Sequence, residues 1–184
     1  MAEPRFQYMA AVCHSAAEDH AGVLRACARA LANADAALAV SCEYLMGWAH
    51  LHLGDESAAL TAFEKVAGSA GSAAADSARA VAARLQYKCQ DYDKAAASWK
   101  TIDPRCRTEW QLDEPLRQTM FLSALTAMNA ERFEEAAEKF REAGRLGLRD
   151  RSLGILLTLC LMKAGQRLLY QDQAEAATYQ VLNA

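Results

Sequence analysis

The chain has 184 residues, enough for one domain with a substantial core and too few for two large ones. Its net charge of −3 argues against a nucleic-acid-binding protein, because such proteins usually carry a basic excess. Hydrophobic residues make up 53% of the chain, and many of them are alanine, the strongest helix former. The chain contains only three prolines and nine glycines, the residues that most often interrupt helices. This composition predicts an all-α protein.

The six cysteines show no spacing typical of a zinc site, since even the closest two, Cys13 and Cys27, are several helical turns apart. A disulfide framework is not expected in a long helical chain whose first residues show no secretory signal pattern. We therefore expect reduced thiols, mostly buried and unreactive. The expected location is intracellular, with the cytoplasm favoured and an organelle as the alternative.

In chain order, the helical stretches pair up and are separated by turn residues. A first pair is predicted over 5–33, and Gly54-Asp55, Gly68 to Ser72 and Gly147 to Asp150 mark later turns. The segment 100–116 contains Pro104 and Pro115 and is predicted to be an ordered loop, with Pro115 in the first turn of the next helix. Residues 151–182 are predicted to form a last pair with a turn at Ala164-Gly165. The total is about ten helices in five hairpins.

One pattern recurs along the chain. An alanine is followed four residues later by an aromatic residue at Ala59 and Phe63, Ala95 and Trp99, and Ala136 and Phe140. A small residue stands at the same distance before each alanine, at Gly47, Ala83 and Ala124. The interval from the first copy to the second is slightly shorter than that from the second to the third. Both fall in the range of about 20 to 50 residues that indicates a solenoid, in which each hairpin buries its apolar face against its neighbours.

These residues resemble tetratricopeptide (TPR) repeats, in which a small residue and an alanine lie on facing helices and an aromatic follows the alanine. The resemblance covers residues 40–147 and implies a right-handed superhelix, an α-solenoid forming a single domain over 1–184. Residues 1–39 and 148–184 are then atypical capping hairpins, as terminal repeats usually are.

TPR arrays bind extended peptides or helices on their concave side, lined by the first helix of each repeat. The resemblance implies a largely apolar and aromatic partner-binding groove of Tyr44, Trp48, Leu51, His52, Arg84, Tyr87, Lys88, Phe121, Leu125, Met128 and Asn129. The alternative is that several of these side chains pack internally. The carboxylate clamp of one TPR subgroup is absent, because the equivalent positions are mostly Tyr8, Val12, Leu45, Ser77 and Val81.

No catalytic, metal or cofactor motif appears in the chain. His50 and His52 point about 200° apart on a helix and cannot share a metal ion. The apolar run 153–162 is too short to span a membrane and is expected to be covered on most sides by protein. It is also a candidate surface for self-association through the terminal helices.

The sequence therefore predicts a non-catalytic adaptor or scaffold subunit of an intracellular assembly, which binds a partner helix or apolar segment. The alternative is a small TPR chaperone that holds an apolar segment of a client, as in bacterial secretion systems. For an enzyme or a nucleic-acid binder we find no positive feature.

Overall fold

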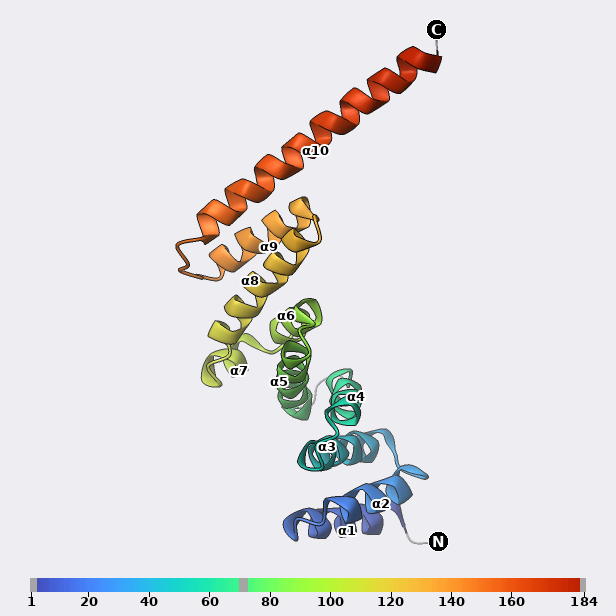
Figure 1. Cartoon of the computed structure of the whole chain (residues 1–184). Coiled ribbons are helices and arrows are strands. Elements are labelled where there is room, and N and C mark those ends of the chain that lie inside the picture. The colour runs from blue at the N-terminus through green and yellow to red at the C-terminus, as the bar shows by residue number, and fades with distance from the viewer. Residues whose placement is uncertain (1–2, 70–72, 183–184) are drawn as a thin grey trace. The chain divides into compact units, whose positions relative to one another are not determined.

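The computed structural model describes residues 3–69 and 73–182, with side chains for 3–69 and 74–172. Within this range the chain is all-α, as predicted, and consecutive helices pack as neighbouring pairs (Figure 1). It divides into two compact units, the first Met1–Trp110 and the second Gln111–Ala184. The described residues form ten helices: α1 Pro4–Ala16, α2 His20–Leu31, α3 Ala36–His52, α4 Glu56–Ala67, α5 Ala73–Lys88, α6 Tyr92–Lys100, α7 Pro104–Glu109, α8 Asp113–Asn129, α9 Phe133–Arg145 and α10 Leu153–Leu182.

Four helix pairs are joined by the same three-residue turn: α1–α2, α3–α4, α5–α6 and α8–α9. In each turn one residue has a positive φ, and the next N–H donates to the carbonyl oxygen five residues earlier at 2.9 Å. This is the Schellman arrangement, which satisfies the last carbonyl groups of the first helix. The positive-φ residues are Glu18 (57°), Gly54 (80°), Gln90 (63°) and Glu131 (59°). The first three are equally spaced along the chain, and Glu131 follows after a slightly longer interval.

Aspartate begins most helices of the first unit. The carboxylates of Asp19, Asp35, Asp55, Asp91 and Asp103 each accept a hydrogen bond from a backbone N–H in the first turn of the helix that follows. In three of the four turns the N-capping aspartate directly follows the positive-φ residue. The C-terminus of one helix and the N-terminus of the next are therefore both capped within three residues.

The small and aromatic positions that recur in the sequence are buried in all three copies. The side chains of Phe63, Trp99 and Phe140 are at most 2% exposed. Gly47 and the recurring alanines of the facing helices are also buried. A Cβ added at Gly47 would lie 2.8 Å from Cζ of Phe63, so the glycine makes room for the ring.

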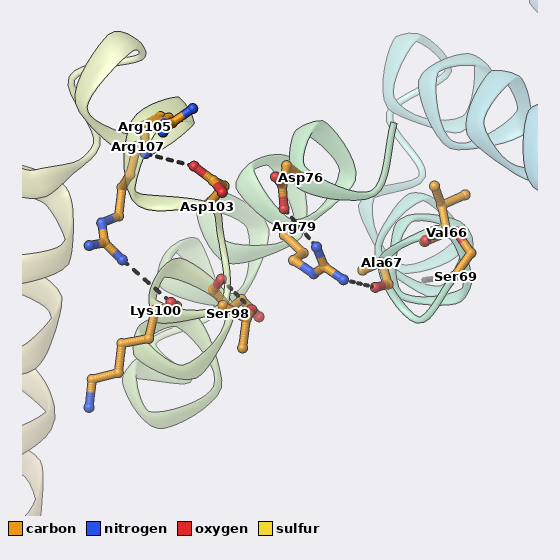
Figure 2. Close-up of polar contacts among 11 residues, drawn as sticks. Val66, Ala67, Ser69, Asp76, Arg79, Ser98, Lys100, Asp103, Arg105 and Arg107 are labelled. Atoms are coloured by element: carbon orange, nitrogen blue, oxygen red, sulfur yellow. Dashed lines mark hydrogen bonds and ion pairs between the residues drawn. The ribbon is translucent and has the colours of Figure 1, made fainter. Parts of the chain in front are cut away.

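Polar side chains link the helices of the first unit. The guanidinium of Arg79 donates to Asp76 on its own helix, α5, and to the carbonyl oxygen of Ala67 at the end of α4, at 2.6 and 2.7 Å (Figure 2). Deeper in the unit, the buried amide of Gln86 donates to Glu64 of α4 and accepts from Ser98 of α6. These contacts fix α4, α5 and α6 against one another.

The segment 100–116 differs from the predicted ordered loop, because α7 forms within it. The carboxylate of Asp103 accepts from the N–H of Arg105, and Pro104 occupies the first helical position, where its missing N–H costs nothing (Figure 2). The prediction for Pro115 is confirmed, since it lies in the first turn of α8. The predicted turn at Gly68 to Ser72 begins where α4 ends, but residues 70–72 lie outside the described part of the chain.

The second unit consists of α8, α9 and α10, and the predicted hairpin over 151–182 is wrong. The segment forms one 30-residue helix, α10, which runs through Ala164 and Gly165 without a break. A single glycine lowers helix stability by about 1 kcal/mol but does not end a helix. The residues directly after Gly165 are Gln166 and Arg167, neither of which is a proline or a preferred N-capping residue that would start a second helix.

The expectation that 153–162 is covered on most sides is also wrong. Leu153, Leu156 and Leu157 pack partly buried against the α8–α9 core, and Cys160 is fully buried there. By contrast, large apolar side chains elsewhere on α10 are 42–73% exposed: Ile155, Leu159, Leu161, Met162, Leu168, Leu169 and Tyr170. By length and composition alone, Leu153–Asp172 is apolar enough to cross a membrane, with a mean hydropathy of 1.3.

The cysteines are less uniformly buried than predicted. Cys27, Cys42 and Cys160 are buried, Cys106 is half-buried, and Cys13 and Cys89 are exposed. Burial raises the pKa of the Cys27 thiol to about 12, and contact with Cys42 adds to the effect. The buried thiols therefore stay protonated and unreactive near neutral pH.

Candidate functional site

The predicted groove residues are distributed over both units. Those on α3 and α5 belong to the first unit and those on α8 to the second. Each group therefore has its own surroundings.

On α3, Tyr44 and Leu51 take part in internal packing. The Tyr44 ring meets the ring of the buried Phe63 edge-on at 6.0 Å, and its hydroxyl lies 2.9 Å from the Ser77 Oγ of α5. Leu51 packs partly buried against the core between α4 and α5. These two residues hold α3, α4 and α5 together.

Trp48 differs from Tyr44, because its ring has two environments. One edge packs against Phe63 at a centroid distance of 5.5 Å, yet the side chain remains 37% exposed. The exposed part of the indole lines a pocket of about 390 Å³ in the first unit. The pocket is lined by Ser15, Glu18, His20, Val23, Leu45, Trp48, Ala49 and His52.

Two histidines from different helices stack at this pocket. The rings of His20 at the start of α2 and His52 at the end of α3 are parallel within 3°, with centroids 4.4 Å apart. His52 was among the predicted groove residues, and the structure brings it together with Trp48. We call this site the Trp48 pocket.

The α1–α2 turn, which contains Glu18 and lies between Ser15 of α1 and His20 of α2, is held by Asp19. Its carboxylate accepts from the Gly22 N–H at 2.8 Å and contacts the His14 Nδ1 at 2.9 Å. The Gly22 hydrogen bond is the main reason why the pKa of Asp19 lies below its usual value, with desolvation opposing it and His14 assisting. A Cβ at Gly22 would come within 2.4 Å of both side chains, so only glycine fits there without rearrangement.

The lining of the Trp48 pocket mixes apolar and polar side chains. Val23, Leu45 and Ala49 contribute aliphatic surface, while Ser15, Glu18 and the stacked histidines contribute groups that can form hydrogen bonds. Its volume lies at the lower end of the range for ligand pockets. Such a site suits an apolar side chain whose own backbone is hydrogen-bonded by these groups.

The α5 residues of the predicted groove are exposed. The Tyr87 ring contacts Tyr92 edge-on at 5.4 Å, and Lys88 forms an ion pair with Glu56 of α4. Neither Arg84, Tyr87 nor Lys88 lines the Trp48 pocket.

The α8 residues of the predicted groove lie mostly against the core of the second unit. Phe121, Leu125 and Met128 pack partly buried against it, and the Phe121 ring meets Phe140 at 5.5 Å. Asn129, the last residue of α8, is exposed. Internal packing thus accounts for much of this group.

Sequence reasoning missed Ser15, Glu18 and His20, because the flanking pair α1–α2 matches the repeat pattern only loosely. The signal that could have found this turn is its Glu18-Asp19 sequence, which precedes Gly54-Asp55 by the same interval that separates Gly54-Asp55 from Gln90-Asp91. Among the described residues, no group of three or more His, Cys, Asp or Glu side chains is arranged to hold a metal ion.

Comparison with protein-family models, with curated proteins and with solved structures finds no match to this chain.

Proposed function

We propose that this chain is a non-catalytic interaction subunit of a larger intracellular assembly, built from TPR-like helical hairpins. Its partner is an amphipathic helix or apolar segment that places one large apolar side chain in the Trp48 pocket. The observation that carries the proposal is that pocket, where a partly exposed indole lies beside aliphatic side chains and groups that can form hydrogen bonds. Pockets that accept a single anchor residue supply much of the affinity of many protein interfaces.

The repeated turns support the TPR-like part of the proposal. The intervals from Gly54 to Gln90 and from Gln90 to Glu131 equal those between successive copies of the alanine–aromatic pattern. Glu18 extends the series by one more equal interval to the α1–α2 pair. The recurring alanines are all fully buried, as are those on the facing helices: Ala59, Ala95, Ala136, Ala83 and Ala124. Equivalent turns and equivalent buried positions are what copies of one hairpin unit would have.

The proposed binding surface is narrower than the predicted groove. Tyr44 and Leu51 stabilise the first unit from within, whereas Trp48 and His52 reach the pocket. We assign partner contact to those two, with Ser15, Glu18 and His20 across the pocket. Arg84, Tyr87 and Lys88 are exposed and remain candidates for peripheral contacts.

The test is cross-linking and affinity capture from the native source with wild type and two variants. Trp48→Ala removes the aromatic wall, and Ser15→Trp fills the pocket from its exposed rim without touching the packing of Phe63. Trp110→Ala is the matched control, because Trp110 is 39% exposed and does not line the pocket. Each variant is first checked for wild-type helicity and unfolding temperature.

We expect one partner in fixed stoichiometry, cross-linked near the Trp48 pocket, with wild type and with Trp110→Ala. Both pocket variants should lose it. Trp48→Ala removes an aromatic contact of the kind whose truncation often costs about 2 kcal/mol or more of binding free energy, and Ser15→Trp leaves no room for the partner's side chain. If both variants retain the partner, the pocket assignment is wrong. Release of the partner during secretion would instead support the chaperone alternative.

A further inference from the structure

The exposed side of α10 carries a regular apolar stripe, which we call the outer seam: Ile155, Leu159, Met162, Gln166 and Leu169. Successive members are alternately four and three residues apart, which is the heptad spacing of a coiled coil. All five side chains are exposed, and Ile155 and Leu169 are 71% and 63% exposed.

The outer seam lies opposite the side of α10 that packs on the rest of the second unit. At about 100° per residue, the seam is centred roughly half a turn away from the inner residues Leu156, Cys160 and Ala164. Cys160 and Ala164 are buried, so α10 is already fixed as a helix on that side. A partner that binds the outer seam therefore does not have to order it first.

We propose that the outer seam pairs with the same seam of a second copy of the chain, with the two α10 helices parallel and in register. The first reason is Gln166, the single polar residue of the seam. In a parallel, in-register pair the two Gln166 amides face each other, and each can donate to and accept from the other. A polar residue at one such position sets the register and orientation of two-stranded coiled coils.

The residues beside the seam fit the same arrangement. In a parallel pair, a flanking residue on one helix faces the residue five positions further along on the other. Gly165 then faces Tyr170, and Thr158 faces Lys163, so no like charges meet. A Cβ at Gly165 would have no atom within 4 Å, and the Tyr170 side chain is 73% exposed. The glycine therefore leaves room for the tyrosine ring of the second copy.

An antiparallel pair and a lipid bilayer fit the seam less well. In an antiparallel pair that matches Leu159 with Leu169, Gln166 faces Met162, whose thioether is a weak acceptor and no donor. In a bilayer the Gln166 amide would be buried without a partner, and Lys163 and Arg167 would lie on the same helix. A second copy supplies a hydrogen-bonding partner for the Gln166 amide and leaves Lys163 and Arg167 at the edge of the interface, in contact with water.

The test is sedimentation equilibrium of the full chain in reducing buffer up to about 100 μM, where even a small interface is populated. We expect a dimer for wild type and at least about tenfold weaker association for Met162→Glu/Leu169→Glu. The matched control is Leu161→Glu/Leu168→Glu, which changes equally apolar exposed residues of the same helix outside the seam. It should dimerise like wild type, and Trp48→Ala should as well, because the inference does not depend on the pocket.

Orientation is read from disulfide cross-links formed with copper-phenanthroline and air and located by peptide mapping. Gln166→Cys should cross-link to itself, whereas Leu159→Cys mixed with Leu169→Cys should not yield the 159–169 pair. A monomeric wild type, or equal weakening by both double variants, overturns the proposal. So does wild type that stays monomeric in buffer but floats with phosphatidylcholine vesicles. A dominant 159–169 cross-link overturns the parallel arrangement.

Discussion

Helices α9 and α10 are neighbours in the second unit, and they handle apolar surface in opposite ways. On α9 the residues Ala136, Ala137, Phe140 and Ala143 are buried, and the outer face carries ion pairs such as Glu135 with Lys139 at 2.6 Å. On α10 the apolar residues continue around the helix, so that burying one side leaves the other exposed.

The difference shows that the sequence of a helix reveals how much apolar surface it carries, whereas the helices packed against it determine how much of that surface is buried. Helix α9 lies between α8 and α10, both of which pack against it. For α10, among the described helices of the second unit, the main packing partner is α9. The exposed apolar side chains of α10 lie together on one helix, whereas exposed apolar residues on a monomer are usually scattered singly.

The largest effect that separates the two helices should come from truncating their apolar side chains. Phe140→Ala removes a fully buried ring of α9 and should lower the free energy of unfolding by about 3–5 kcal/mol. Leu168→Ala, at a 55% exposed position of α10, should change it by less than about 0.5 kcal/mol. Urea denaturation measures both, and similar losses would contradict the difference in burial.

A smaller effect is expected at the two turns that flank α9. Glu131 has a φ of 59°, which costs a residue with a side chain about 1–2 kcal/mol, so Glu131→Gly should stabilise the second unit by about 1 kcal/mol. Gly147 has a φ of 86°, and Gly147→Ala should destabilise it by a similar amount. If both substitutions stabilise the second unit, or both destabilise it, the left-handed backbone conformation of these turns does not determine the change in unfolding free energy.

Replacing a glycine within each helix by alanine should change the stability by a smaller amount than the substitutions in the turns. Gly165→Ala on α10 meets no neighbouring atom and should stabilise the helix by about 0.5–1 kcal/mol. At Gly144 on α9, a new Cβ would lie 3.2 Å from the Leu153 Cδ2, so Gly144→Ala should gain less. Thermal unfolding of the two variants side by side checks the order.

The smallest effect should come from the charged face of α9. Glu135→Gln breaks ion pairs with Arg132 and Lys139, and surface pairs on a helix contribute about 0.2–0.5 kcal/mol each. The loss should shrink when the measurement is repeated in high salt, because exposed charges are screened. A loss that is independent of salt would mean that Glu135 stabilises α9 in another way.

The local features of the fold could be predicted from the sequence, because alanine, aromatic and turn residues act over short distances. The aligned residues Phe63, Trp99 and Phe140 are buried, and helices form on either side of Gly54-Asp55. At Ala164-Gly165 the prediction of a turn rested on a single glycine, and it was wrong because the helix continues through both residues. Packing of Cys160 against the α8–α9 core and burial of Ala164 favour the continuous helix, and local sequence does not reveal such packing.

The candidate site was predictable in part. Trp48 and His52, which line the pocket, were among the predicted groove residues because the TPR resemblance maps them to the concave side of the first helix of a copy. Their pocket partners, Ser15, Glu18 and His20, belong to the α1–α2 turn and the helix ends beside it, much earlier in the chain. The stack of His20 on His52 depends on how α1 and α2 pack on α3, which no spacing rule specifies.

The shared three-residue turns also govern where the chain can change length. One residue inserted between Gly54 and Asp55 would rotate α4 by about 100° relative to α3 and would turn Ala59 and Phe63 away from the core. The connection that contains α7 is longer, and it lies within the one interval between turns, Gln90 to Glu131, that exceeds the others. Insertions and affinity tags should therefore be tolerated there, whereas equal insertions at Glu18, Gly54, Gln90 or Glu131 should abolish folding of the adjoining pair.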